Sequence, residues 1–194
     1  MIIGLTGGIG SGKSFVAEYL AGLLNFAVLN ADLLCRNQLQ QQMPGWQGIK
    51  EQWGSRFIDL TGNIDRPLLR KTLFTDTRVR HSVEQILHPL VRQEISNKKS
   101  AAADVIVEVP LLFEVGWQED FDWIVVVYAA NECCLQRIVN RDRISMEEAR
   151  LAVSVQMSLA DKALRADSVI ENSGFLVQTI LQVYHLAHLL KKMG

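Results

Sequence analysis

The segment 7–14 constrains this chain more than any other part of it. It reads Gly-Gly-Ile-Gly-Ser-Gly-Lys-Ser and fits the phosphate-binding loop pattern G-x-x-x-x-G-K-[ST] without a mismatch. The apolar residues 2–6 before it predict a short buried strand, and residues 15–24 after it have helical spacing. The order of strand, loop and helix favours a phosphate site over a chance glycine-rich turn.

Each residue type in this loop suits a bound triphosphate. The glycines let the backbone curl round the phosphates, and the loop N–H groups together with the helix N-terminus supply positive potential. Lys13 can reach the β- and γ-phosphates, and the Ser14 hydroxyl can hold Mg²⁺. The loop residues that we expect to contact the nucleotide are Gly8, Gly10, Ser11, Gly12, Lys13, Ser14 and Phe15.

Composition limits the remaining possibilities. The chain has 194 residues, of which 48% are hydrophobic, enough for one domain with room for an embedded subdomain. The net charge of -1 indicates neither a nucleic-acid nor a membrane partner, and no run of about 18 apolar residues predicts a transmembrane helix. The N-terminus leads directly into the predicted strand, which argues against a signal peptide. Three cysteines without a disulfide pattern favour free thiols in the reduced cytoplasm, and the sequence does not indicate an oligomeric state.

The apolar runs alternate with helical stretches. Strands are predicted at residues 2–6, 26–32, 105–110, 123–129 and 168–172. This alternation is typical of an α/β fold with a five-stranded parallel sheet flanked by helices. The last stretch, residues 175–192, predicts an amphipathic helix that covers the sheet with Leu176, Ile180, Val183, Ala187 and Leu190.

The interval between the second and third strands is too long for one crossover helix. It contains turn signals at Pro44-Gly45 and at Thr61-Gly62-Asn63, followed by helical spacing over residues 67–97, so we expect an α-helical insertion. Between Arg66 and Lys99, eight Lys and Arg residues face three acids. This excess fits either a solvated helical surface or a site for a second substrate that carries phosphate.

Two acids follow predicted strands, at the edge where open parallel sheets bind ligands. Asp32 comes after the second strand, where it can accept a proton from an attacking hydroxyl or help to hold a metal. Its alternative is to cap a helix over residues 33–42. Glu108 ends the third strand inside an apolar run, so it requires a partner. That partner is Mg²⁺ through a water, Lys13, or another charge in a structural ion pair.

Arginines follow the fourth strand, and an amide follows the fifth. Arg137 and Arg141 are four residues apart and share a helix face. They can fold over the nucleotide as a lid and neutralise phosphoryl charge, or they can form surface ion pairs such as Arg137 with Asp142. Asn172 can hydrogen-bond a purine edge.

Several segments resemble the dephospho-CoA kinase family, in the same order along nearly the whole chain. They are residues 4–14, Ala31-Asp32 with Arg36, Leu87-His88-Pro89, Pro110-Leu111-Leu112-Phe113-Glu114, Gln136-Arg137 with Arg141-Asp142, and residues 170–174. Many families share the phosphate loop. The His-Pro and Pro-Leu-Leu-Phe-Glu segments are much more particular to this family.

The resemblance implies a P-loop kinase fold and an activity. The core would comprise about residues 1–32, 101–130 and 165–194, with a helical substrate-binding insertion at 33–100 and a lid at 131–164. The implied reaction is the ATP- and Mg²⁺-dependent phosphorylation of the ribose 3′-hydroxyl of dephospho-CoA, the last step of coenzyme A synthesis. The implied catalytic residues are Asp32 as base, Lys13 and Arg137; Arg141 and Asn172 would bind ATP; Asp32, Arg36, His88, Pro110 and Leu111 would bind the acceptor.

The chain departs from the family pattern at two positions. Asn30 stands where the family has a first aspartate after the second strand, which weakens a metal role there. Phe15 stands where the loop usually continues with threonine, so a hydroxyl near the α-phosphate is lost and nucleotide preference can differ.

Two other functions fit part of the pattern. Another small-molecule kinase of this fold, acting on a nucleoside or nucleotide, would share the loop and the lid. A nucleotide-switched binding protein would use the D-x-x-G match at Asp59–Gly62, but the sequence contains no guanine-reading N-K-x-D motif.

Overall fold

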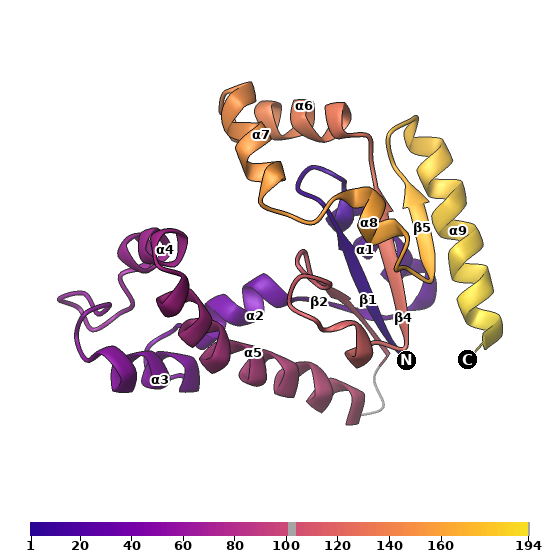
Figure 1. Ribbon diagram of the computed structural model, residues 1–194. Helices are drawn as coiled ribbons and strands as arrows, with labels where there is room; N and C mark the ends of the chain where they lie inside the picture. Colours follow the sequence, from indigo (N-terminus) through magenta and orange to yellow (C-terminus); the bar gives the residue numbers. More distant parts are fainter. Residues whose placement is uncertain (101–103, 194) are drawn as a thin grey trace. The chain divides into compact units, whose positions relative to one another are not determined.

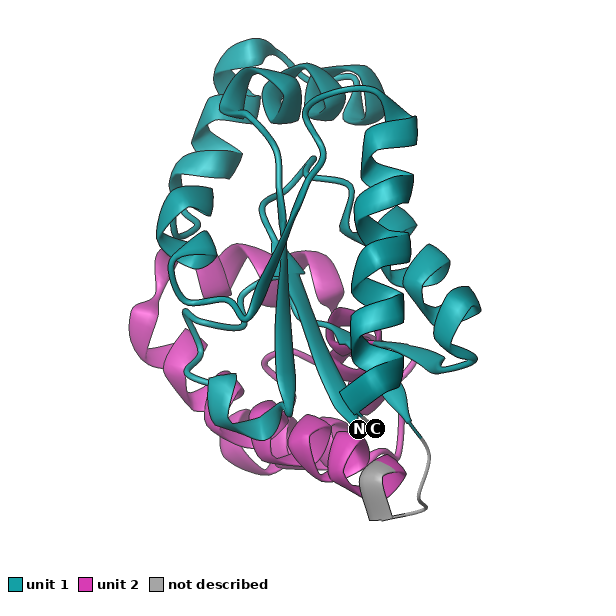
Figure 2. Ribbon diagram, turned by 90° about the vertical axis from the view of Figure 1, so that its right-hand side faces the viewer, with its two compact units in different colours: residues 1–29, 101–194 teal, residues 30–100 magenta. Residues whose placement is uncertain are grey.

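The structure, a computed structural model, describes residues 1–100 and 104–193. Its contacts divide the chain into two compact units, shown in different colours in Figure 2. The first unit consists of Met1–Leu29 and Ala101–Gly194, and the second of Asn30–Ser100. The predicted insertion falls inside the second unit, and the predicted lid falls inside the first.

The first unit is built on a five-stranded sheet with strand order β2-β3-β1-β4-β5. The strands are β1 (Ile2–Gly7), β2 (Ala27–Asn30), β3 (Val105–Glu108), β4 (Trp123–Tyr128) and β5 (Ser168–Glu171). β1 pairs in parallel with β3 and β4, and β4 pairs in parallel with β5. β1 and β3 are buried throughout, as strands covered on both faces should be.

Helices cover this sheet and share its core. They are α1 (Lys13–Leu24), α6 (Asn131–Asp142), α7 (Met146–Ser154), α8 (Leu159–Ala163) and α9 (Leu176–Met193), with a 3₁₀ turn at Gln118–Asp120. α9 lies beside β5 (Figure 1) and packs on α1 and β5. The main core joins side chains such as Leu5, Leu20 and Val183 from β1, α1 and α9. α6 packs on α7, and α8 packs on β4.

The second unit is helical. It contains α2 (Ala31–Gln38), α3 (Pro44–Trp53), α4 (Arg66–Thr75) and α5 (Thr77–Ser100). The long helix α5 packs against each of the other three, round a core that includes Ile49, Phe57 and Leu87. This unit therefore has an apolar core of its own.

The predicted parallel sheet is confirmed, and several local predictions need correction. The strand predicted at 26–32 is shorter, and the helix predicted at 33–42 is α2, which begins at Ala31 and ends at Gln38. The turn predicted at Pro44-Gly45 is wrong. Pro44 begins α3, where its missing N–H costs nothing, and Gly45 lies so close to Gln38 that a Cβ would meet the Gln38 carbonyl oxygen at 2.7 Å.

The predicted turn at Thr61-Gly62-Asn63 is confirmed. The Asp59 carboxylate accepts the N–H groups of Thr61 and Asn63, which closes the turn. Leu176 was expected on the covered face of the last helix, but its side chain is 55% exposed at the start of α9. The other four residues predicted for that face are buried or half-buried.

Within residues 1–100 and 104–193, no helix combines the length and apolarity needed to cross a membrane.

Candidate active site

The phosphate loop connects β1 to α1 and is shaped by positions where only glycine fits. Gly12 has φ +92° and stands at the N-cap of α1 without a side-chain cap, so the first N–H groups of the helix face the loop. A Cβ on Gly12 would lie 2.2 Å from the Asn172 Nδ2, and a Cβ on Gly10 would lie 2.6 Å from the Cys134 carbonyl oxygen. The loop is therefore enclosed by α6 and by the residue after β5.

Lys13 lies across this loop. Its Nζ donates to the Gly8 carbonyl oxygen at 2.7 Å. The side chain therefore folds back over the start of the loop, which is the direction needed to reach the β- and γ-phosphates of a bound nucleotide.

Ser14 and Glu108 form an oxygen pair at the end of the loop. The Ser14 hydroxyl donates to the Glu108 carboxylate at 3.0 Å, and Glu108 is only 6% exposed at the end of β3. Both groups are hard oxygen donors of the kind that Mg²⁺ prefers, so the residues present fit this ion. Of the residues in the described ranges 1–100 and 104–193, Ser14 is the partner that the structure shows for the Glu108 carboxylate.

The Asn172 side chain supports the phosphate loop through a hydrogen bond to its backbone. Its Nδ2 donates to the Ser11 carbonyl oxygen at 2.7 Å, and its Oδ1 accepts from the Thr179 hydroxyl at 2.8 Å. The side chain is buried, so both ends of the carboxamide serve the protein interior. This placement corrects the expected contact with a purine edge: Asn172 holds the loop in shape through its backbone.

The two arginines of α6 are placed differently. The Arg137 guanidinium donates to the carbonyl oxygens of Gly10 at 3.3 Å and Asn172 at 2.8 Å, which places it at the phosphate loop. Arg141 is exposed and pairs with its neighbour Asp142 at 2.7 Å. The surface pair weighed for Arg137 with Asp142 is therefore made by Arg141.

The Pro110–Glu114 segment follows β3 and surrounds a charged residue that the sequence analysis missed. The Lys162 side chain is fully buried, and its Nζ donates to the Pro110 carbonyl oxygen at 2.7 Å and pairs with Glu114 at 2.9 Å. Burial lowers the pKa of Lys162, and the Glu114 carboxylate opposes that shift. Leu111, predicted to bind the acceptor, is 41% exposed. The spacing of Lys162 in the sequence does not distinguish it from a surface lysine. The acid Glu114 was the only sequence feature that could have indicated a buried cation as its partner.

In the second unit, α2 carries Asp32 and Arg36, both exposed and one turn apart. The cap alternative for Asp32 is wrong, because the Asn30 side chain accepts the Leu33 N–H at 3.0 Å and caps α2. Burial of Cys35, and secondarily the charge of Asp32, raise the pKa of this thiol to about 11. Cys35 therefore stays protonated at neutral pH.

His88 lies on α5, the helix on which α2 packs. It is half-buried, and burial lowers its pKa; Arg92 acts in the same direction and Glu84 opposes it. His88 is therefore mostly neutral at pH 7.

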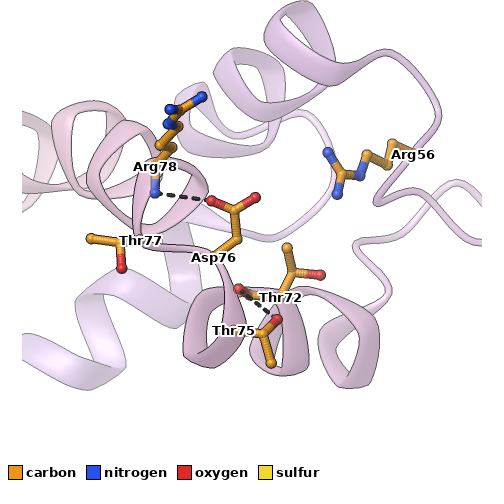
Figure 3. A pocket seen from close by; sticks show the side chains of 6 residues that line it. All are labelled: Arg56, Thr72, Thr75, Asp76, Thr77 and Arg78. Carbon is orange, nitrogen blue, oxygen red and sulfur yellow. Dashed lines mark hydrogen bonds between the residues drawn. The ribbon is translucent and has the colours of Figure 1, made fainter.

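Each unit contains an open cavity. In the first unit, a cavity of about 430 Å³ is lined by Gly8 and Ile9 of the phosphate loop and by residues that follow β4 and α7. In the second unit, a cavity of about 600 Å³ is lined by Arg56, Arg78, Asp76 and three threonine side chains (Figure 3). The Asp76 carboxylate accepts the Arg78 backbone N–H at 3.0 Å, so it stabilises the first turn of α5.

Comparison with known proteins agrees with this geometry. A family model described as dephospho-CoA kinase matches residues 1–178. A dephospho-CoA kinase from Desulfotalea psychrophila is 37% identical, with 94% of each chain covered. Among solved structures, TT1252 from Thermus thermophilus matches with a TM-score of 0.82 and 31% identity, covering 100% of this chain and 98% of that one. Dephospho-CoA kinase from Campylobacter jejuni matches with a TM-score of 0.71 and 25% identity, covering 98% and 97%.

The family match spans the phosphate loop, the second unit, the arginines of α6 and the brace after β5. The chain therefore belongs to the dephospho-CoA kinase family.

Proposed function

We propose that this protein transfers the γ-phosphoryl group of ATP to the ribose 3′-hydroxyl of dephospho-CoA, the last step of coenzyme A synthesis. The observation that carries the proposal is the phosphate loop, braced by Asn172 and with Ser14 bonded to Glu108, in a chain of this family. The three cysteines are free thiols, which suits a reducing cytoplasm as the place of the reaction.

The donor side of the reaction belongs to the first unit. The loop N–H groups and the N-terminus of α1 bind the phosphates, and Lys13 offsets the charge of the β- and γ-phosphates. Ser14 and Glu108 would hold Mg²⁺, which when bound supplies positive charge to the phosphate oxygens. Arg137, already at Gly10, stabilises the charge that develops on the transferred group, and Arg141 binds the nucleotide from the same helix.

On the acceptor side, we assign Asp32 as the residue that orients the ribose 3′-hydroxyl and accepts its proton. In the second unit this carboxylate is exposed and is not occupied by helix capping, because Asn30 caps α2. Arg36 and His88 contact the acceptor, together with Pro110 and Leu111 after β3. An exposed arginine beside the base suits the pyrophosphate of dephospho-CoA.

The switch-protein alternative has no support in the site. The D-x-x-G segment forms a turn that the Asp59 carboxylate closes on Thr61 and Asn63, within the helical unit. A switch aspartate would instead have to be available to a bound nucleotide.

Incubation with ATP, Mg²⁺ and dephospho-CoA, followed by mass spectrometry of the product, tests the proposal. Coenzyme A phosphorylated at the ribose 3′ position is expected. Nucleosides and nucleotides serve as competing acceptors. Efficient phosphorylation of one of these, with dephospho-CoA left unchanged, would assign the protein to another small-molecule kinase activity.

A further inference from the structure

Gln156 contacts the phosphate loop although it lies far from it in sequence. It follows α7, and its Oε1 accepts the backbone N–H of Ile9 at 2.9 Å, across 147 residues. Ile9 is the third residue of the loop motif. One loop donor is therefore held by a side chain that no sequence motif had indicated.

The backbone beside Gln156 is linked through Glu114 to a fully buried lysine. The Met157 N–H donates to Glu114 at 2.9 Å, and Glu114 is paired with the fully buried Lys162. Lys162 in turn donates to the Pro110 carbonyl oxygen, which also accepts from the Thr6 hydroxyl at 3.2 Å, just before the loop. This chain of contacts fixes the position from which the Gln156 side chain reaches the loop.

The cavity of about 430 Å³ lies against the first half of the phosphate loop. Gly8, Ile9 and Gln156 all line it. The Lys13 Nζ, which reaches the β- and γ-phosphates in such loops, is bonded to the Gly8 carbonyl oxygen at 2.7 Å. The Gly8 end of the loop would therefore face the γ-phosphate of a bound nucleotide, and Gln156 lies beside that end.

The chemistry of the cavity favours an amide donor. Its lining contains no acidic or basic side chain among the described residues. The Oε1 of Gln156 is occupied by Ile9, whereas its Nε2 has no hydrogen-bond partner within residues 1–100 and 104–193. The two N–H donors of this half-buried amide are therefore available to an anion beside the loop.

We propose that Gln156 is a further phosphoryl-contacting residue: its Oε1 fixes the Ile9 N–H, and its Nε2 donates to the terminal phosphoryl group of ATP. The inference rests on the proposed phosphoryl transfer. It assigns to the Lys162–Glu114 pair the role of positioning Gln156, without contact with substrate.

Two substitutions separate this role from simple support of the loop. Gln156→Glu keeps an oxygen for the Ile9 N–H, removes the amide donors and places negative charge beside the phosphate. Gln156→Met keeps the length and removes both functions. If Nε2 contacts the phosphoryl group, kcat falls by roughly 10²-fold or more in Gln156→Glu and by less in Gln156→Met. A purely supporting role reverses that order, and wild-type kcat in Gln156→Glu overturns the proposal.

Nucleotide titration gives a second readout that does not depend on turnover. ADP lacks the terminal phosphoryl group, so Gln156→Met should weaken ATP binding several-fold more than ADP binding. Equal loss for both nucleotides, or for neither, contradicts the proposal. Gln118→Glu, at an exposed position of the same unit, controls for added charge. Wild-type protein that makes no phosphorylated dephospho-CoA would instead refute the proposed function, which keeps the two failures distinct.

Discussion

The donor region of the first unit and the helical second unit present their functional side chains in opposite ways. Round the phosphate loop, Lys13, Ser14, Arg137 and Asn172 are bonded to backbone or side-chain oxygens, in part from distant segments. In the second unit, Asp32 and Arg36 are exposed on α2, and their side chains form no hydrogen bond or ion pair with the described residues. The proposed donor residues are thus held by contacts within the protein, whereas the proposed acceptor residues Asp32 and Arg36 are not. The five predictions below test this contrast.

The largest effect is expected for Lys13→Ala, at the centre of the donor region. Removing this ammonium eliminates charge stabilisation that is greatest in the transition state, so kcat should fall by roughly 10³-fold or more. Steady-state kinetics with ATP and dephospho-CoA measure the loss. Lys191→Ala, on the exposed end of α9, is the matched control. Near-normal turnover in a folded Lys13→Ala protein would remove the basis of the donor assignment.

Asp32→Asn tests the second unit by the same measure. If the carboxylate accepts the hydroxyl proton, kcat should fall by about 10²–10⁴-fold while ATP binding persists. The melting temperature should stay the same, because Asn30 caps α2. Asn30→Ala should have the opposite effect: the free energy of unfolding should fall by about 1 kcal/mol, because the cap of α2 is lost, while kcat changes little. An Asp32→Asn protein with full kcat and lowered stability would contradict the catalytic assignment and leave Asp32 with a role in the stability of α2.

The third prediction concerns the two arginines of α6. Arg137→Ala should lower kcat by roughly 10²-fold or more, as phosphate-directed arginines do elsewhere. Arg141→Ala should cost less, because Arg141 is exposed and shared with Asp142. Comparing kcat and the KM for ATP in both variants checks this order. If kcat falls equally in the two variants, the contact of Arg137 with the loop does not predict which arginine contributes more to catalysis.

Glu108→Gln should change the metal requirement more than the maximal rate. Without the carboxylate beside Ser14, the Mg²⁺ concentration needed for half-maximal activity should rise about tenfold. Titrating Mg²⁺ at saturating ATP measures this shift, with Glu119→Gln as an exposed control. An unchanged Mg²⁺ dependence would leave Glu108 with a structural role only.

The smallest effect concerns the pH dependence of stability at His88. Burial lowers its folded-state pKa, so the unfolded chain binds the proton more readily. The stability that neutral His88 contributes is therefore present above the unfolded pKa of about 6.5 and is lost as pH falls below it. The drop in melting temperature between pH 7.5 and pH 5.5 should be larger in wild type than in His88→Gln, by no more than a few degrees. Parallel curves would show that the burial of His88 has no such consequence.

Local sequence was sufficient for much of the donor site. The order of strand, glycine loop, Lys13 and Ser14 predicted β1, the loop and α1, because these depend on neighbouring residues and on backbone freedom at Gly12. Alternating apolar runs likewise predicted the parallel sheet. Helix ends were less predictable: Asp32 and Asn30 are both good caps, and only the backbone geometry of α2 distinguished them.

The sequence by itself determined that the chain forms an α/β fold and predicted which residues bind phosphate, since motif spacing and apolar periodicity are local properties. Only the tertiary structure decided which polar groups meet across long separations. Asn172 reaches Ser11 across 161 residues, Gln156 reaches Ile9, and Lys162 is buried against Glu114. The physical reason is that a buried polar group must find a partner wherever packing places one, and packing is a property of the whole fold.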